Sequence, residues 1–143
     1  MDITITEMST VLHNLALYPE WQDRILAEVS ALPSPLTCAQ LCGLKQLDYF
    51  VLESARLRPA VEVTFPERLV TSQVIGGYTI PAGTSVCASI AALNRSPELF
   101  EQPLLFEPMR HSDEATRRAF HRFGLGVRRC SSCCLFSLLY IPY

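Results

Sequence analysis

The first part of the chain places apolar residues at helical intervals. In residues 3–18 the apolar positions with this spacing are Ile5, Met8, Val11, Leu12 and Leu15. Pro19 interrupts the pattern and suits the first turn of a second helix. That helix, residues 19–32, carries an apolar face made of Trp21, Ile25, Val29 and Leu32. A third helix is predicted for residues 47–57, ending before Pro59.

The pattern changes after residue 60. Residues 61–65 and 68–72 are rich in β-formers, and a short strand is predicted at 78–80 between two glycine-containing turns. Residues 84–90 read as a strand or a strand-to-helix transition, and residues 94–122 as an ordered loop. The predicted fold class is mainly α with small antiparallel β hairpins (α+β).

Composition narrows the class of protein. The 143 residues fit one domain, and 49% apolar with 18% charged residues describes a globular chain. The net charge of −2 argues against a general nucleic-acid binder. The chain shows no secretory signal, and its longest apolar run, residues 133–143, is well short of the roughly 20 residues that span a bilayer. No membrane anchor is therefore predicted within this chain.

The six cysteines are predicted to be thiols or metal ligands, because no secretory signal favours disulfides. Cys38 and Cys42 have C-x-x-x-C spacing, and Cys130 and Cys133 have C-x-x-C spacing. Four thiolates of this kind could hold zinc, although neither pair lies in a knuckle-like turn sequence. A zinc or redox module is thus one alternative interpretation.

Two motifs predict an ion-pair network. Glu53 and Arg56, in E-x-x-R spacing, lie on one face of the third helix. The segment F-E-P-M-R delivers Arg110 on a proline-containing loop. A glutamate flanked by two arginines would pin that loop to the helix. The alternatives are a solvated surface pair and an exposed loop arginine.

The segment F-G-L-G-V-R-R-C, residues 123–130, combines features that suit a planar cofactor. Gly124 and Gly126 let the backbone pass close to a flat partner. Arg128 can hold an anionic group while the thiolate of Cys130 binds a metal. Haem is a planar dicarboxylate, and cysteine thiolate is one of its axial ligands.

Taken in order, E-x-x-R, F-x-P-x-R and F-G-x-G-x-R-x-C resemble the C-terminal part of a cytochrome P450, a haem-thiolate monooxygenase. Residues 12–29 resemble the end of that family's long central helix and the helix after it. Residues 76–86 resemble its small sheet, and residues 94–110 the meander that follows. Residues 61–72 resemble fungal secondary-metabolism members of the family.

The resemblance implies a role for each motif residue. Cys130 would be the axial ligand of the haem iron, Arg128 would pair with a haem propionate, and Phe123 would pack beside the thiolate. Gly124 and Gly126 would shape the loop under the haem. Glu53, Arg56 and Arg110 would form a structural triad. The residues that would contact the substrate are Val61, Val63 and Phe65.

The sequence also departs from the family pattern. Ile3 stands where the family has its oxygen-handling threonine, and Thr4 is the nearest candidate. Ser132 replaces a glycine, and residues 131–143 do not resemble the family's next helix. We therefore expect residues 1–130 to be a partial cytochrome P450 domain, truncated at both ends, and residues 131–143 an aberrant tail. A broken gene model or a read-through intron would explain that tail, and the fragment is expected to be inactive. A non-catalytic remnant is the other alternative.

The family's reaction uses iron to activate O₂ and insert one oxygen atom into an apolar substrate. Electrons come from NADPH through a flavin-containing reductase. Clustered arginines before the cysteine would steer that acidic donor: Arg110, Arg117, Arg118, Arg122, Arg128 and Arg129. Full-length relatives are often found at the endoplasmic reticulum membrane, but this sequence does not indicate its own location.

Overall fold

Two helices form the first part of the fold, as the apolar periodicity predicts. The computed structural model describes residues 3–33, 37–120, 122–124 and 130. Helix α1 spans Ile3–Leu17 and helix α2 spans Pro19–Ser30. The Tyr18 amide between them donates a hydrogen bond to the Asn14 carbonyl at 2.9 Å, so the connection is tight. Pro19 begins α2 because the first turn of a helix needs no amide donor.

A short helix, α3 (Cys38–Cys42), lies where the sequence pattern predicts none. Five residues are too few to display a period. The helix is defined instead by a capping box. The Thr37 side chain accepts from the Gln40 amide at 3.3 Å, and the Gln40 side chain accepts from the Thr37 amide at 2.9 Å. Thr-x-x-Gln was the sequence signal for this helix.

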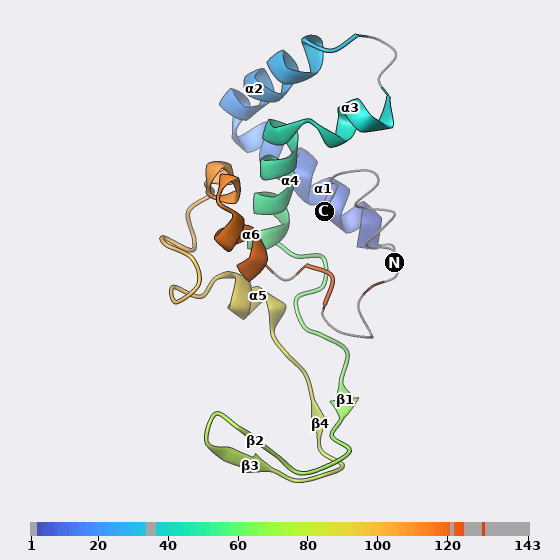
Figure 1. Cartoon of the computed structure of the whole chain (residues 1–143), viewed down its shortest axis with the longest axis vertical. Helices are drawn as coiled ribbons and strands as arrows, with labels where there is room; N and C mark the ends of the chain where they lie inside the picture. The colour runs from blue at the N-terminus through green and yellow to red at the C-terminus, as the bar shows by residue number, and fades with distance from the viewer. Residues whose placement is uncertain (1–2, 34–36, 121, 125–129, 131–143) are drawn as a thin grey trace.

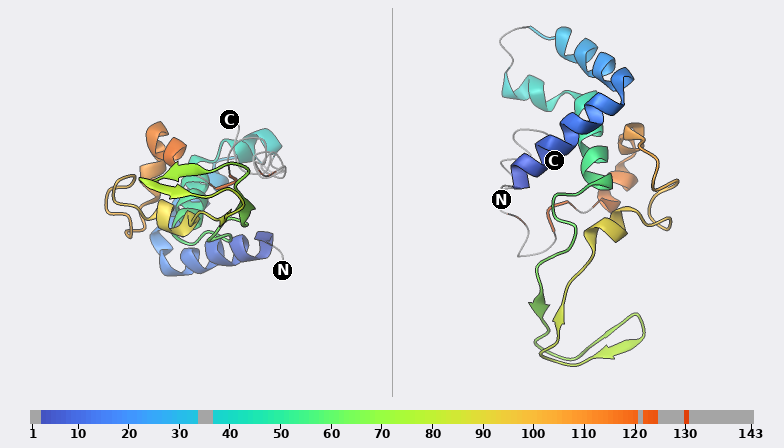
Figure 2. Two further views of the ribbon diagram at one scale, coloured as in Figure 1. Left: turned by 90° about the horizontal axis from the view of Figure 1, so that it is seen from below. Right: turned by 180° about the vertical axis from the view of Figure 1, so that it is seen from behind.

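Helix α4 spans Lys45–Leu57 and runs through the centre of the helical part (Figure 1). It begins slightly before the predicted start at Leu47. Its first turn is capped from α2, because the Glu28 carboxylate accepts hydrogen bonds from the Gln46 and Leu47 amides at 3.0 and 3.3 Å. Helices α1 and α2 both pack against α4 (Figure 2).

The strands form two small antiparallel pairs that extend away from the helices (Figure 1). Strand β1 pairs with β4, and β2 pairs with β3. Their bounds are Glu67–Arg68 for β1, Gln73–Ile75 for β2, Tyr78–Ile80 for β3 and Ser85–Val86 for β4. Gly76 and Gly77 make the β2–β3 turn with φ of 57° and 84°, a region that favours glycine.

The predictions for residues 61–72 were wrong in detail. Residues 61–65 form no named strand, although an isolated bridge between Val63 and Ser89 and two backbone hydrogen bonds join them to residues 88–91, and Arg68 alone of residues 68–72 lies in a strand. The exposed fractions of Phe65 and Val70 are 83% and 93%. β-Forming side chains favour a strand only where a neighbouring surface buries them, and the described residues provide none here.

The segment predicted as a loop, residues 94–122, contains further helical turns. A 3-10 helix η1 spans Pro108–Ser112 and helix α6 spans Glu114–Ala119, while helix α5, Ile90–Asn94, begins where the strand-to-helix transition was predicted and ends at the first residue of this segment. Each is short and begins with a side-chain cap; Asp113, for example, accepts from the Thr116 amide at 2.8 Å. Capping rather than apolar periodicity defines these turns.

The core lies where α1, α2 and α4 meet the loop before η1. Its buried members are Val11, Trp21, Phe50 and Val51. Phe106 reaches it from the loop, stacking on Tyr18 at 4.2 Å between ring centroids and meeting the Phe50 ring edge-on at 5.3 Å. The mainly α fold with small antiparallel strand pairs confirms the predicted class. Within the described residues, no helix has the length and apolar character needed to cross a membrane.

Candidate functional site

Glu53 is the centre of a buried network that joins α4 to η1. Its side chain is fully buried, as is that of Arg56. Arg56 donates from Nε to Oε2 and from Nη2 to Oε1, both at 2.8 Å. Arg110 Nε donates to Oε1 at 3.0 Å, and the Glu107 amide donates to the same oxygen at 2.9 Å. The structure therefore brings together the three residues of the predicted triad.

The same two arginines also satisfy backbone carbonyls of the loop between α5 and η1. Arg56 Nη1 donates to the carbonyls of Asn94 and Pro103, each at 2.7 Å. Arg110 Nη1 donates to the Glu101 carbonyl at 2.8 Å. Each guanidinium thus neutralises Glu53 and holds the loop in one conformation, as its fixed fork of donors allows.

His111 is a fourth member that the sequence analysis missed. Its ring is fully buried, and Nε2 lies 2.9 Å from Glu53 Oε2. Because an ionised carboxylate only accepts, Nε2 carries the proton that is donated. The other ring nitrogen, Nδ1, is buried and has no hydrogen-bond partner in the described part of the chain, which fits an unprotonated atom. Its position directly after Arg110 in F-E-P-M-R-H was the only sequence signal.

The network shifts the pKa values of both acid and base. Burial alone would raise the pKa of Glu53, but hydrogen bonds from Arg56, His111 and the Glu107 amide outweigh it and lower the pKa to about 2. Burial lowers the pKa of His111 and outweighs the opposite effect of Glu53. The carboxylate is therefore ionised and the imidazole neutral at pH 7.

The loop before Cys130 is described at both of its ends. The Cys130 amide donates to the Phe123 carbonyl at 3.0 Å, which closes the loop. Gly124 has φ of 74°, and no described atom lies within 4 Å of where a Cβ would stand. Cys130 is exposed and forms no disulfide with any cysteine in the described part. Gly126 and Arg128 lie outside the described residues.

These features fit a thiolate-ligated haem. An exposed thiol is available as an axial ligand, and the open face at Gly124 leaves room for a flat group against the backbone. Phe123, half-buried, stands at the start of the same closed loop. The donor at Cys130 is therefore of the type that haem iron accepts.

A second ion pair, not predicted from the sequence, ties this loop to α1. Arg122 Nη2 donates to Glu7 Oε2 at 3.1 Å, and each side chain is 12% exposed. The Arg122 guanidinium lies over the Phe123 ring, 5.0 Å from its centroid. Glu7 therefore contacts the residue that precedes the closed loop.

Asp48, on α4, is a buried acid in the same part of the molecule. Its Oδ1 has no hydrogen-bond partner among the described residues. Burial raises the pKa of Asp48 to about 7, although the charges of Arg117 and Arg122 lower it. Asp48 is consequently partly protonated near neutral pH, which its sequence position did not reveal.

The arginines before Cys130 do not form one exposed cluster, which corrects the prediction. Arg110 and Arg122 are directed inward, with side chains only 11% and 12% exposed. Arg117 and Arg118 lie on the surface of α6, where Arg118 pairs with Glu114 at 2.6 Å. Arg128 and Arg129 lie outside the described residues. Arg110, Arg118 and Arg122 are separated because each pairs with a different acid, namely Glu53, Glu114 and Glu7.

The remaining candidates are exposed rather than gathered at a site. Thr4 lies in the first turn of α1, and its residue is exposed. Val63 and Phe65 are exposed, while Val61 is half-buried. For zinc, no three His, Cys, Asp or Glu side chains group together among the described residues.

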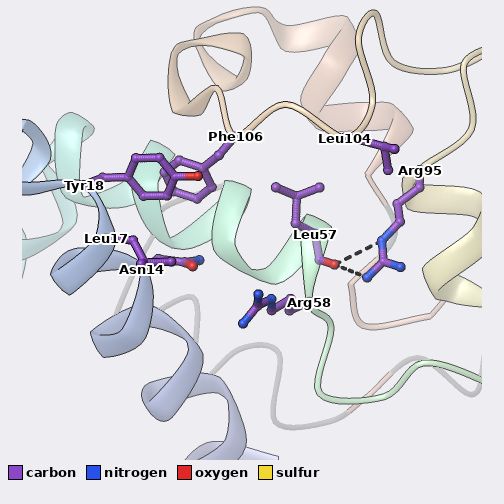
Figure 3. Close-up of a pocket in the computed structure, with 8 residues that line it drawn as sticks. All are labelled: Asn14, Leu17, Tyr18, Leu57, Arg58, Arg95, Leu104 and Phe106. Atoms are coloured by element: carbon purple, nitrogen blue, oxygen red, sulfur yellow. Dashed lines mark hydrogen bonds between the residues drawn. The ribbon is translucent and has the colours of Figure 1, made fainter.

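A cavity of about 250 Å³ lies between α1, the end of α4 and the loop that carries Phe106. Figure 3 shows the stacked rings of Tyr18 and Phe106 at one end and Arg95 at the other. Arg95 donates from Nε to the Leu57 carbonyl at 3.1 Å and makes a second bond to it from Nη2. No residue predicted to contact haem or substrate lines this cavity.

Comparison with known proteins gives a consistent result. The protein-family model described as Cytochrome P450 matches residues 1–131. The monooxygenase asaD of Aspergillus flavus is 37% identical over 139 residues, covering 91% of this chain and 26% of that protein. Cyclooctat-9-en-7-ol 5-monooxygenase of Streptomyces melanosporofaciens is 34% identical over 140 residues, covering 90% and 29%.

The fold gives the same relationship. A zebra fish cytochrome P450 solved with progesterone superimposes with a TM-score of 0.85 at 26% identity, covering 96% of this chain and 32% of that one. The chain thus spans about a quarter of the length of the curated relatives that it matches. Similar proteins occur in bacteria, fungi and animals, so they do not single out the fungal members.

Proposed function

Because the chain belongs to the cytochrome P450 family, we propose that it supplies the thiolate ligand and the structural core of a haem-thiolate monooxygenase. One observation carries the proposal. Cys130 presents an exposed thiol at the end of a loop that its own amide closes onto Phe123. The Glu53 network precedes this loop in the sequence order expected of the family and holds α4 to η1.

Five residues are proposed to hold the haem. Cys130 provides the axial thiolate, and Phe123 packs beside it. Gly124 and Gly126 let the backbone lie close to the porphyrin, which the positive φ of Gly124 supports. Arg128 offers a guanidinium to a propionate. When bound, thiolate-ligated haem supplies the activation of dioxygen and the oxygenation of an organic substrate.

The residues of this chain contribute position rather than acid–base chemistry. The carboxylate of Glu53 is saturated with hydrogen bonds and has a pKa of about 2, so it does not serve as a proton donor at pH 7. Its arginine partners fix the segment from Asn94 to Arg110 against α4. Thr4, exposed on α1, remains the proposed residue for handling oxygen.

The proposed substrate is an apolar organic molecule. The exposed apolar side chains of Val63 and Phe65, with Val61 beside them, are the proposed contacts. Names of similar proteins support this class, since one oxidises cyclooctat-9-en-7-ol and another was solved with progesterone. Electrons are proposed to come from NADPH through a flavin-containing reductase, with Arg117 and Arg118 on α6 as the exposed cations nearest in sequence to the loop.

The test is haem reconstitution of the purified chain. Reduced protein under carbon monoxide should give the red-shifted Soret band of thiolate ligation, and Cys130→Ala should abolish it. Cys87→Ala, which removes another exposed thiol, is the matched control and should retain the band. Persistence of the band in Cys130→Ala would refute the assignment. Purified protein that carries zinc and takes up no haem would favour the cysteine-ligated metal module instead.

A further inference from the structure

The ion pair between Glu7 and Arg122 joins segments that are 115 residues apart. Its two side chains are each 12% exposed, whereas those of the Arg118–Glu114 pair on α6 are 77% and 70% exposed. Exposed pairs contribute little, because solvent screens them and two flexible side chains must be ordered. Breaking a mostly buried pair leaves a charge without compensation and has a larger effect. The low exposure of the Glu7–Arg122 pair therefore predicts a larger contribution to stability than that of the Arg118–Glu114 pair.

Glu7 is itself held in place by its surroundings. It lies on α1, where most of its residue is buried, and its Oε1 accepts a hydrogen bond from the Ala60 amide at 3.4 Å. The segment containing Ala60 continues directly from α4. The carboxylate of Glu7 thus links α1 to the segment after α4, through Ala60, and to the segment before Cys130, through Arg122.

Arg122 transmits this attachment to the loop. It precedes Phe123, and its guanidinium lies over the Phe123 ring at 5.0 Å. Phe123 in turn provides the carbonyl that accepts from the Cys130 amide at 3.0 Å. Arg122 also lies near enough to Asp48 on α4 for the two charges to interact. The guanidinium therefore joins the acid of α1 to the residue at the start of the closed loop.

We infer that Glu7 and Arg122 are positioning residues, which fix Phe123 relative to α1 and, through the hydrogen bond from the Cys130 amide to the Phe123 carbonyl, set the position of Cys130. The consequence for ligation rests on the proposed function of Cys130. The effect on the loop does not, because it is a property of the protein without haem. α1 is proposed above to carry the oxygen-handling residue, so the pair would hold the two sides of the reaction site at a fixed separation.

The loop is tested by hydrogen exchange of the Cys130 amide in the haem-free full chain. Glu7→Gln and Arg122→Gln remove one charge each. Either variant should accelerate exchange of this amide about tenfold. The reason is that the free energy of local opening falls when the mostly buried ion pair no longer opposes it. Amides of strands β2 and β3 should exchange at the unchanged rate, because opening of this strand pair leaves the Glu7–Arg122 pair intact. Equal acceleration in β2 and β3 would show that the effect is not confined to the segment around Cys130 and would overturn the inference.

A double variant separates a joint role from two independent ones. If the residues act through their pair, Glu7→Gln with Arg122→Gln should be no faster than either single variant. Rates that multiply would overturn the inference. Glu114→Gln, which breaks the exposed pair on α6, is the control and should leave Cys130 exchange unaltered.

Haem-loaded protein gives the second readout. Glu7→Gln should bind haem but show a smaller fraction of the thiolate-type Soret band under carbon monoxide, since the thiol is less well placed. An unchanged fraction would contradict the positioning role for the ligand. The proposed function fails separately, through retention of that band in Cys130→Ala.

Discussion

Arg56 and Glu53 face each other one turn apart on α4 through two parallel hydrogen bonds, each 2.8 Å long. Both side chains are fully buried. A paired geometry of this kind compensates charges that would otherwise be unfavourable away from water. Three further donors complete the coordination of the carboxylate, from Arg110, His111 and the Glu107 amide. Stability and loop conformation should therefore depend on this one carboxylate.

Replacing Glu53 with alanine should destabilise the chain strongly. Two guanidiniums and one imidazole lose their acceptor, and an unpaired buried charge typically costs about 3–5 kcal/mol. The free energy of unfolding, measured in urea, should fall by about that amount or folded protein should be lost. Glu114→Ala removes an exposed glutamate that also pairs with an arginine, and it should change stability by under about 1 kcal/mol. Similar effects of the two variants would contradict a structural role for Glu53.

Arg56→Lys should be damaging although it keeps the charge. Lysine cannot reproduce the two-point contact with Glu53 and also reach the carbonyls of Asn94 and Pro103. Each buried group left without a partner costs about 1–3 kcal/mol, so we expect a loss of at least about 2 kcal/mol in urea unfolding. Arg58→Lys, at the exposed end of the same helix, is the control. Wild-type stability in Arg56→Lys would show that charge alone suffices.

As the pH falls, protonation of His111 should lower the free energy of unfolding before protonation of Glu53 does. Burial lowers the pKa of His111 below 6.5, so the folded state disfavours its protonation. That contribution is complete above pH 6.5 and is lost as pH falls below it. The contribution of Glu53, whose folded pKa is about 2, is complete above pH 4.5 and is lost between there and about pH 2. Unfolding free energies measured across pH should show both losses.

His111→Gln should remove the upper of these two losses, because glutamine can donate to Glu53 without titrating. His13→Gln, which changes an exposed histidine of α1, is the matched control for the substitution itself. A profile of His111→Gln that still falls just below pH 6.5, as in the unmodified chain, would contradict the assignment of that loss to His111.

Asp48 should have the opposite pH dependence. Its folded pKa of about 7 lies above the ordinary value of 3.8, so its contribution is fully present below pH 3.8 and is lost as pH rises through 7. The difference corresponds to at most about 4 kcal/mol. Asp48→Asn should therefore raise the free energy of unfolding at pH 8 and leave it nearly unchanged at pH 4. Asp23→Asn, at an exposed position in α2, is the matched control for the substitution itself, and an equal effect of Asp48→Asn at both pH values would contradict the assignment.

The sequence alone determined the parts of the fold that depend on near neighbours. Helices α1 and α2 were predicted because their apolar residues repeat with the helical period, and the end of α4 was predicted because Pro59 follows it. The facing of Glu53 and Arg56 follows from their separation of three on a helix. The family resemblance, carried by three short motifs, indicated Cys130 as the candidate haem ligand. The short capped helices were missed, because a single cap gives no periodic signal.

Tertiary structure decided which distant groups meet. Arg110 could have been an exposed loop residue; the loop between α5 and η1 instead brings it and His111 to Glu53. Arg122 belonged by sequence to a basic cluster, yet it pairs with Glu7 on α1. Local spacing fixes contacts within a helix because the helix sets the geometry itself. Contacts between residues that are 57 or 115 positions apart depend on the fold of the whole chain, which decides which buried charged groups lie close enough to pair.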